Sequence, residues 1–196
     1  MDAFGDQTPS LRLASLLQLG HNMSVDLYID DVLSDAKFII VRILGGRGYW
    51  DYGIEQLVAL ARAKDIPLVL LPGDDLLSLS TVKGREYQNI WRYLIEGGPQ
   101  NSENLLRLIY ENLNSSVNWN WSPAAPLVKA GGYWPGKAQA SLDEIRVNWV
   151  KNQPVTPIIF YRSLVQAANL DVIDALVEEL CANGLNPLPI FVASLK

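Results

Sequence analysis

The residues of this chain that could take part in chemistry follow its apolar segments. One group comes directly after the β-branched run at residues 38–44, and its members are Arg47, Tyr49, Trp50 and Tyr52. His21 follows an earlier apolar run that ends near Leu16, and Asp74 follows a third that ends near Leu71. Ligands of open parallel sheets gather beyond the carboxyl ends of the strands. We therefore expect all of these side chains to lie around one crevice.

The chain contains a single histidine, His21, and a single cysteine, Cys181. These numbers exclude an internal disulfide and any zinc site built from several histidines or cysteines of this chain. An imidazole that is neutral near pH 7 can accept a proton or bind a cation. It can equally act as a hydrogen-bonding or capping group, and both hypotheses for His21 stay open. Cys181 lies in an apolar-periodic segment, so we expect a small buried hydrophobe there.

Glu55 and Arg47 carry charge in the same region. The pattern of residues 53–64 predicts an amphipathic helix, with Glu55 in its first turn, where a carboxylate complements the helix dipole. A role as a general base is the alternative for Glu55. Arg47 can pair with Asp51 or Asp74, or it can contact a substrate, and we favour the ion pair.

Tyr49, Trp50 and Tyr52 can stack on a flat ring or cover the sheet, and packing against the sheet is the simpler hypothesis. The preceding Gly45-Gly46-Arg47-Gly48 does not have the spacing of a dinucleotide fingerprint, so these glycines indicate a sharp turn of the backbone. The chain contains no Walker loop, serine-elbow motif or HExxH sequence. Generic motifs therefore assign no reaction.

Strand and helix signals alternate along the first part of the chain. Apolar runs predict strands at residues 11–16, 38–44 and 67–71. Periodic segments between them predict a helix that begins at an N-cap Ser24, and the helix at 53–64. Such alternation implies right-handed βαβ units. The predicted fold class is therefore α/β, with a flavodoxin-like or Rossmann-like doubly wound parallel sheet.

Two helical stretches are predicted between residues 82 and 113. They are split at residues 96–99, because two glycines and a proline cannot continue a helix. Asn101 or Ser102 is the expected cap of the second stretch. An aromatic segment punctuated by proline and glycine follows, without a clear period.

The α/β pattern restarts near the end of the chain. Strands are predicted at residues 157–161 and 189–194, and a helix at 171–183 with Gly184 as its C-terminal cap. A single β-α-β unit cannot bury its own apolar faces, so we expect a truncated domain here. The predicted parts are a disordered lead-in (1–10), an α/β domain (11–114), an aromatic connector (115–154) and the first β-α-β of a second, truncated α/β domain (155–196).

Composition limits the possible partners. The net charge is −5 and no basic cluster occurs, so nucleic acid is not an expected partner. The apolar runs are too short to cross a bilayer, so no membrane span is expected. The first residues carry acids and no basic region, unlike a signal peptide. We therefore expect a cytoplasmic protein.

Several blocks of sequence together resemble the cobaltochelatase large subunit (CobN type), of the CobN/magnesium chelatase H-subunit family. The early blocks are residues 21–28, 41–57 and 70–74. The later blocks are residues 97–101, 132–136, 157–163 and 189–196. They occur in the order and spacing of the family from about Leu11 onward. Asn22 departs from the pattern, because the family usually has proline there.

The resemblance implies an N-terminal fragment of a subunit that binds a tetrapyrrole and a metal. The family inserts Co²⁺, as substrate metal, into hydrogenobyrinic acid a,c-diamide during cobalamin synthesis. The implied partners are a corrin or porphyrin macrocycle and two AAA+ subunits (CobS/CobT type), which use ATP and Mg²⁺ that this chain does not bind. The enzyme is a multi-subunit metal chelatase, a ligase that forms nitrogen–metal bonds, and we expect the isolated fragment to be inactive.

Metal insertion needs a base that removes pyrrolic protons and weak ligands that hand over the metal. His21 suits either task, as catalytic base or metal ligand, and Glu55 is the second catalytic candidate. The candidates for substrate binding are Arg47, Tyr49, Trp50 and Tyr52. The alternatives are a magnesium chelatase H-type fragment of chlorophyll biosynthesis, a non-catalytic flavodoxin-like interaction module, and a small-molecule-binding α/β domain that acts alone.

Overall fold

The structure is a computed structural model that describes residues 10–71, 74–114 and 122–194. It divides into two compact units, each with its own apolar core. The first comprises Met1–Tyr93 with Glu103–Pro123, and the second Leu94–Ser102 with Ala124–Lys196. The predicted disordered lead-in lies outside the described residues, apart from Ser10. No helix in the described ranges is long and apolar enough to span a membrane.

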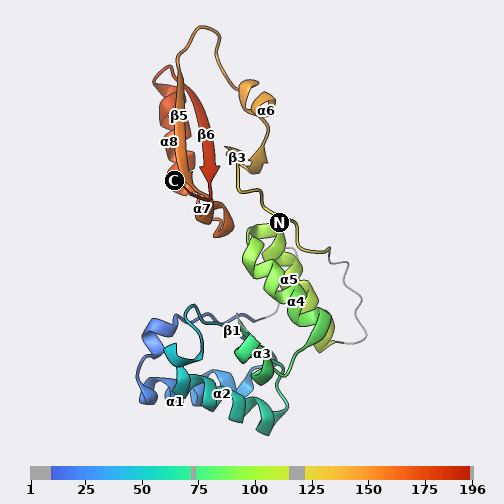
Figure 1. Cartoon of the computed structure of the whole chain (residues 1–196). Coiled ribbons are helices and arrows are strands. Elements are labelled where there is room, and N and C mark those ends of the chain that lie inside the picture. Colours follow the sequence, from blue (N-terminus) through green and yellow to red (C-terminus); the bar gives the residue numbers. More distant parts are fainter. Residues whose placement is uncertain (1–9, 72–73, 115–121, 195–196) are drawn as a thin grey trace. The chain divides into compact units, whose positions relative to one another are not determined.

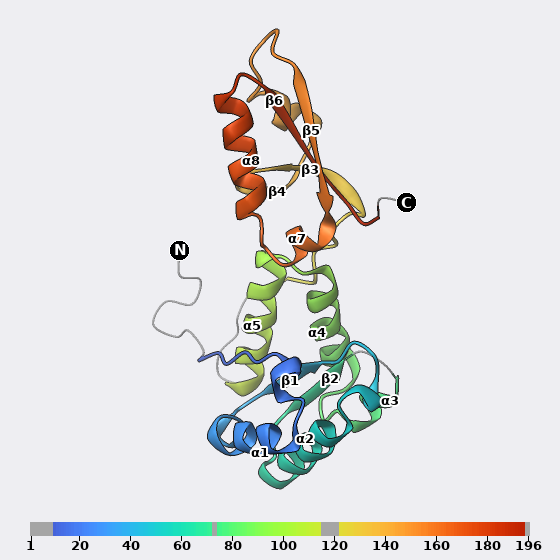
Figure 2. The same cartoon turned by 90° about the vertical axis from the view of Figure 1, so that its left-hand side faces the viewer.

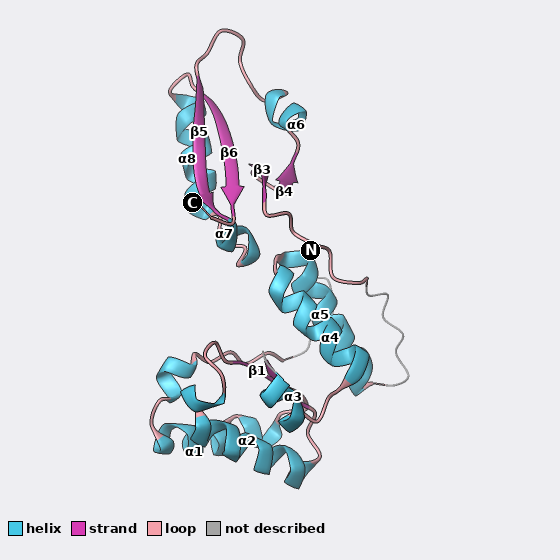
Figure 3. Ribbon diagram, in the orientation of Figure 1, coloured by secondary structure: helices cyan, strands magenta, loops and turns pink. Residues whose placement is uncertain are grey.

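The first unit is built around a pair of parallel strands. Its elements in chain order (Figures 1 and 3) are η2 (Leu16–Leu19), α1 (Asn22–Asp31), η3 (Leu33–Asp35), β1 (Ile39–Arg42), η4 (Arg47–Tyr49), α2 (Asp51–Lys64), β2 (Leu68–Leu71), α3 (Asp74–Leu79) and most of α4 (Gly84–Glu96) and α5 (Pro99–Leu113). In β1 and β2, Ile39 lies opposite Leu68 and Arg42 opposite Leu71. The predicted α/β class with parallel strands is confirmed.

The core of the first unit forms between this strand pair and α2. All four residues of β2 are buried, as expected of a strand covered on both faces. On α2 the buried side chains Ile54, Leu57 and Ala61 recur at helical spacing. Helices α1 and α2 lie side by side (Figures 1 and 2). The periodicity of residues 53–64 therefore predicted the buried face correctly.

Three predictions at the start of this unit are wrong. Residues 11–16 form no strand, and Leu13 is 85% exposed; an alternating pattern makes a strand only where a neighbouring strand is available. Helix α1 begins at Asn22, so Ser24 lies inside it and is not the cap. Helix α2 begins at Asp51, so Glu55 lies beyond its first turn. A carboxylate complements the helix dipole only within the first turn, and the predicted role of Glu55 there is wrong.

The break between α4 and α5 is confirmed. Gly97 and Gly98 have φ of 65° and 83°, which only glycine adopts without strain. Asn101 and Ser102 are not caps, because α5 already begins at Pro99. Asn101 is buried instead, where its side-chain amide donates to the carbonyl of Ala125 and accepts from the N–H of Ala125.

The second unit contains a four-stranded mixed sheet with helices packed against it (Figure 2). Its elements are β3 (Ala130–Trp134), β4 (Lys137–Ala140), α6 (Leu142–Arg146), β5 (Val155–Tyr161), α7 (Arg162–Gln166), α8 (Asp171–Ala182) and β6 (Asn186–Val192). The strand order is β4-β3-β6-β5, with β5 parallel to β6 and β3 antiparallel to both of its neighbours. The predicted strands at 157–161 and 189–194 and the helix at 171–183 are present with shifted ends.

The segment predicted to be an aromatic connector contributes β3, β4 and α6 to this sheet unit. Strand β3 contains Gly131 and Gly132, which on their own indicate a turn. Gly132 is needed because a Cβ there would lie 2.4 Å from the carbonyl oxygen of Ala140 on the neighbouring strand. The sequence pattern of the predicted connector therefore did not reveal the elements at residues 130–146, and the connector and its boundaries stay a prediction.

Prolines occupy β5 and β6 without interrupting their pairing. The N–H of Asn186 donates to the carbonyl of Pro154 on the β5 side. In a parallel ladder, only every second residue of a strand directs its N–H and C=O at a given neighbouring strand. It follows that Pro157, Pro187 and Pro189 fall at positions whose missing N–H would point away from the β5–β6 ladder. On the other side of β6, the indole N–H of Trp149 donates to the carbonyl of Pro187 at 2.9 Å.

Helix α8 packs on one face of the sheet through Ile173 and Val177, which are buried. Gly184 has φ of 74°, so the predicted left-handed glycine ends the helix, one residue after the C-cap Asn183. Cys181 is exposed, so the expectation of a buried hydrophobe was wrong. Helix α8 therefore buries fewer of its apolar side chains than its composition suggests.

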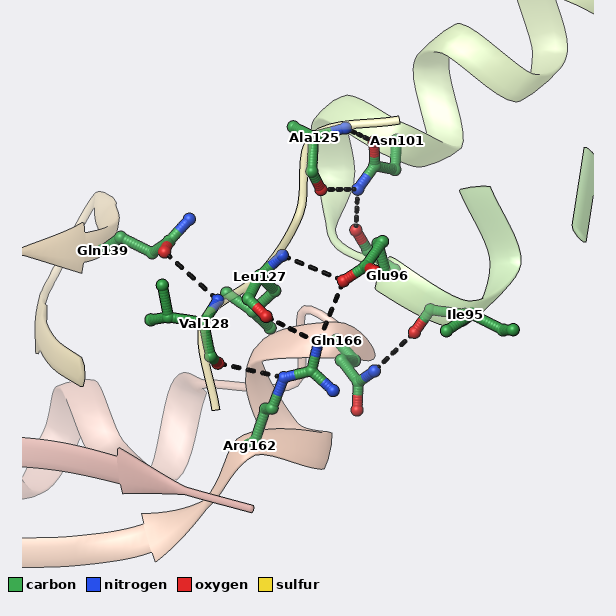
Figure 4. Close-up of polar contacts among 10 residues, drawn as sticks. Ile95, Glu96, Asn101, Ala125, Leu127, Val128, Gln139, Arg162 and Gln166 are labelled. Atoms are coloured by element: carbon green, nitrogen blue, oxygen red, sulfur yellow. Dashed lines mark hydrogen bonds and ion pairs between the residues drawn. The ribbon is translucent and has the colours of Figure 1, made fainter. Parts of the chain in front are cut away.

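A part-buried ion pair joins α7 to the end of α4 within the second unit (Figure 4). The guanidinium of Arg162 donates to the carboxylate of Glu96 at 3.0 Å and to the carbonyls of Leu127 and Val128. The carboxylate of Glu96 also accepts from the N–H of Leu127 at 2.9 Å. Beside it, Gln166 donates to the carbonyl of Ile95. These bonds fix the segment that leads into β3.

Candidate functional site

A surface pocket of about 290 Å³ lies in the first unit, where the segment after β1 meets η2 and the start of α1. Its lining residues are Leu16, Leu17, Leu19, Gly20, Asn22, Val25, Tyr49, Trp50, Asp51 and Tyr52. Gly45 and Gly46, with φ of 123° and 79°, let the chain turn sharply from β1 into η4. This turn brings the three aromatic residues to the pocket.

Trp50 holds one wall of the pocket in place. Its indole N–H donates to the carbonyl of Leu19 at 2.8 Å, a contact that joins segments 31 residues apart. The ring lies directly against Gly53 of α2, where a Cβ would be 2.1 Å from Cε2 of the indole. Glycine at position 53 therefore makes room for the indole, and the indole holds η2 against α2.

Tyr52 forms a second link across the pocket. Its hydroxyl donates to the carboxylate of Asp26 on α1 at 2.7 Å. This hydrogen bond, together with partial desolvation and the negative charge of Asp26, raises the pKa of Tyr52. Tyr49 is 59% exposed, so its ring is the most accessible of the three aromatic side chains.

Arg47 lies on the surface beside the pocket and is engaged by two carboxylates. Its guanidinium contacts Asp51 at 2.6 Å and Glu55 at 3.2 Å. The hydrogen bond to Asp51 is the main reason why the pKa of Arg47 is raised. The predicted ion pair with Asp51 is confirmed, and the side chain of Asp74 lies outside the described residues. Arg47 and Glu55 do not line the pocket.

His21 is the N-cap residue of α1 and is exposed. Its neighbours Gly20 and Asn22 line the pocket, whereas His21 itself does not. Its side chain makes no capping hydrogen bond to the helix. Within the described ranges, no three histidine, cysteine, aspartate or glutamate side chains come together as a metal site. A role of His21 as base or metal ligand stays a prediction.

The structure thus gathers Tyr49, Trp50 and Tyr52 around one pocket, and it pairs Arg47 with Glu55 beside them. The pocket also has an aliphatic wall that the sequence pattern did not predict, and it consists of Leu16, Leu17, Leu19 and Val25. The closely spaced leucines of η2 fit a helical turn better than a strand, and this signal could have identified the wall.

The pocket can hold an apolar or aromatic group but not a whole macrocycle. Its volume is at the lower end of about 300–1,000 Å³, the usual range for sites of small molecules. Its surroundings are acidic, because Asp51 and Glu55 share the single guanidinium of Arg47 and Asp26 contacts the hydroxyl of Tyr52. The arrangement therefore suits one edge of a larger flat ligand, whose remainder would extend beyond the pocket.

Comparisons with known proteins point to one family. Residues 91–196, just over half of the chain, match the model of the CobN/magnesium chelatase family. The chain is 42% identical over 200 residues to the aerobic cobaltochelatase subunit CobN of Pseudomonas aeruginosa, covering 99% of this chain and 16% of that protein. The subunit of the same name from Sinorhizobium is 39% identical over 200 residues, covering 95% of this chain and 16% of that protein.

A solved structure is similar as well. The catalytic subunit of cobaltochelatase from Mycobacterium tuberculosis matches with a TM-score of 0.67 and 26% identity, over 87% of this chain and 14% of that one. The chain spans about 16% of the length of the curated relatives that it matches. A family model that covers more than half of the chain, together with relatives of 39–42% identity, shows that the chain belongs to the CobN/magnesium chelatase family.

Proposed function

We propose that this chain is part of the large, tetrapyrrole- and metal-binding subunit of an ATP-dependent cobaltochelatase. The whole enzyme would insert Co²⁺ into hydrogenobyrinic acid a,c-diamide, with AAA+ partner subunits of the CobS/CobT type that use ATP and Mg²⁺. The observation that carries this proposal is the 42% identity to a cobaltochelatase subunit across 99% of the chain.

Within this function, the first unit supplies one wall of the macrocycle site. The aromatic side chains Tyr49, Trp50 and Tyr52 line a pocket that fits an edge of a flat ring. His21 is the candidate base or metal ligand, because its exposed imidazole adjoins two lining residues. Glu55 is the second candidate base, held by Arg47.

The proposal is tested with a chimaera. The segment of the Pseudomonas aeruginosa subunit that aligns with this chain is replaced by residues 1–196, and Co²⁺ insertion is measured with the partner subunits, ATP and the corrin substrate. We expect the chimaera to retain insertion activity and the isolated chain to have none, since the chain matches only 16% of that subunit. A parallel assay with Mg²⁺ and protoporphyrin tests the magnesium chelatase alternative.

Two variants of the chimaera test the candidate base. His21→Ala should lower the rate of insertion while leaving assembly with the partners intact. Met23→Ala, at an exposed position of α1 that does not line the pocket, is the matched control. A chimaera that assembles but inserts neither metal would contradict the proposed function. A fully active His21→Ala chimaera would reject His21 as base and ligand.

A further inference from the structure

We propose that the face of β5 that points away from α8 is a docking surface for an amphipathic helix of the same subunit. This helix belongs to the polypeptide that follows the present chain, and it leads to a strand beside the outer edge of β5. The inference goes beyond the proposed function and rests on it only in taking the chain as part of a longer subunit.

The two faces of β5 differ in how they are covered. Phe160 is 7% exposed and packs in the core that contains Ile173 of α8. Ile159, the preceding residue, is 57% exposed, and it lies on the other face because successive side chains of a strand alternate. Val155 and Tyr161 share that alternation and are 46% and 53% exposed. These three side chains define the open face of β5.

The open face continues onto β6, where α6 covers it only in part. Ile190 of β6 lies opposite Ile159 and is half-buried. It also lies opposite Gly132 of β3, and a Cβ at Gly132 would be 2.8 Å from Cδ1 of Ile145 on α6. Helix α6 therefore packs on the β3 side of this face. Parallel strands are normally covered on both faces, so the bare part over β5 calls for a further helix.

The topology of the sheet favours a helix of the following polypeptide on this face. Strand β6 has β3 on one side and β5 on the other, so a further strand at this end of the sheet can join only beside β5. Connections between parallel strands are right-handed, which places α8 on one face as the chain passes from β5 to β6. A connection from β6 back past β5 runs in the opposite direction. Its helix therefore lies on the face opposite to α8, which is the open face.

The outer edge of β5 can accept the strand that this path requires. In the described part of the chain β5 has β6 as its only neighbour. By the alternation of the ladder, Ile159 and Tyr161 direct their N–H groups to the outer edge, and Pro157 leaves one gap there. A path to the other end of the sheet, beside β4, would place its helix on the α8 side and leave the open face bare. The apolar character of the open face therefore favours the path past β5.

The test compares the 196-residue chain with an extended chain. The extension is the next stretch of the Pseudomonas aeruginosa subunit after the matched segment, about 40 residues, which is enough for the helix and strand of a βαβ unit. Ile159→Cys is introduced into both chains, and its rate of maleimide labelling is measured by mass spectrometry of the peptide. We expect labelling to be about tenfold slower in the extended chain, because the docked helix must move away before the reagent can enter. Val155→Cys probes the same face and should be protected to a similar degree.

Two controls show where the extension docks. Val172 is 68% exposed on α8, so Val172→Cys should be labelled equally fast in both chains. An extension of the same composition in scrambled order should leave Ile159→Cys fully reactive. Equal labelling of both open-face cysteines in the two chains would overturn the inference, and so would protection of Val172→Cys in their place. These readouts need no metal insertion, so the failure of the inference is distinguishable from that of the proposed function, which the chimaera tests.

Discussion

Gly53→Ala should destabilise the first unit, although alanine is the better helix former. In an exposed helix the change would stabilise by about 1 kcal/mol. Here the added Cβ would lie 2.1 Å from the indole of Trp50, so the ring must move. Overpacking costs about 2 kcal/mol, and loss of the hydrogen bond from the indole to Leu19 about 1 kcal/mol more. The net expected loss is about 2 kcal/mol.

A double-mutant cycle isolates the contact between the two side chains. In a Trp50→Ala background the three atoms nearest to the new Cβ are removed, so Gly53→Ala should stabilise by about 1 kcal/mol. The coupling free energy is therefore about 3 kcal/mol. Native-state hydrogen exchange at the amide of Leu57 reports the free energy of opening of the first unit, because Leu57 is buried on α2.

The control lies on the same helix. Ala59 is exposed, and Ala59→Gly should cost about 1 kcal/mol in both backgrounds, with no coupling to Trp50. If Gly53→Ala stabilises the chain that retains Trp50, the close packing of indole against helix is refuted. The wall of the pocket that depends on this packing would then be refuted as well.

Three further outcomes are expected. Glu96→Gln should lower the free energy of unfolding of the second unit by about 2 kcal/mol, because it leaves the part-buried guanidinium of Arg162 without its anion. Urea unfolding measures this loss, and an unchanged midpoint would contradict the prediction. The hydrogen bond from Lys137, with those from Ser141, lowers the pKa of Glu144 from 4.5 to about 2. Stability from this carboxylate is thus present above pH 4.5 and is lost as the pH falls towards 2, and an NMR titration of Lys137→Met should show the pKa rising. Cys181 should react with one equivalent of a maleimide without denaturant, and protection would restore the buried interpretation.

The parts of the fold that sequence predicted correctly are those determined by local patterns. Residues 68–71 of the predicted run form a fully buried strand because every side chain in it is apolar. The break at Gly97 and Gly98 followed from backbone freedom alone. Strand β3 could not be predicted in this way, because glycines in a sequence usually indicate a turn. In β3 they instead allow the neighbouring strand to approach closely, and this tertiary contact leaves no local pattern.

The candidate site was predictable only in part for a related reason. The order of strand, glycines and aromatics placed Tyr49, Trp50 and Tyr52 at one edge of the sheet, and the structure gathers them there. The opposite wall depends on a hydrogen bond between Trp50 and Leu19, which no local pattern contains. Contacts of this kind depend on tertiary packing, so sequence periodicity could not supply the pocket.

The prolines of the second sheet have a consequence for how this unit avoids misassembly. While β3 is still undocked, the side of β6 that it will cover is an open strand edge, which is the usual template for aggregation. Pro187 and Pro189 remove two donors from that edge, and Pro157 removes one from the outer edge of β5. A foreign strand therefore finds fewer donors on either edge, which disfavours mispairing while the unit folds. Substituting these prolines by valine should leave the native pairing intact while making refolding at high protein concentration less efficient.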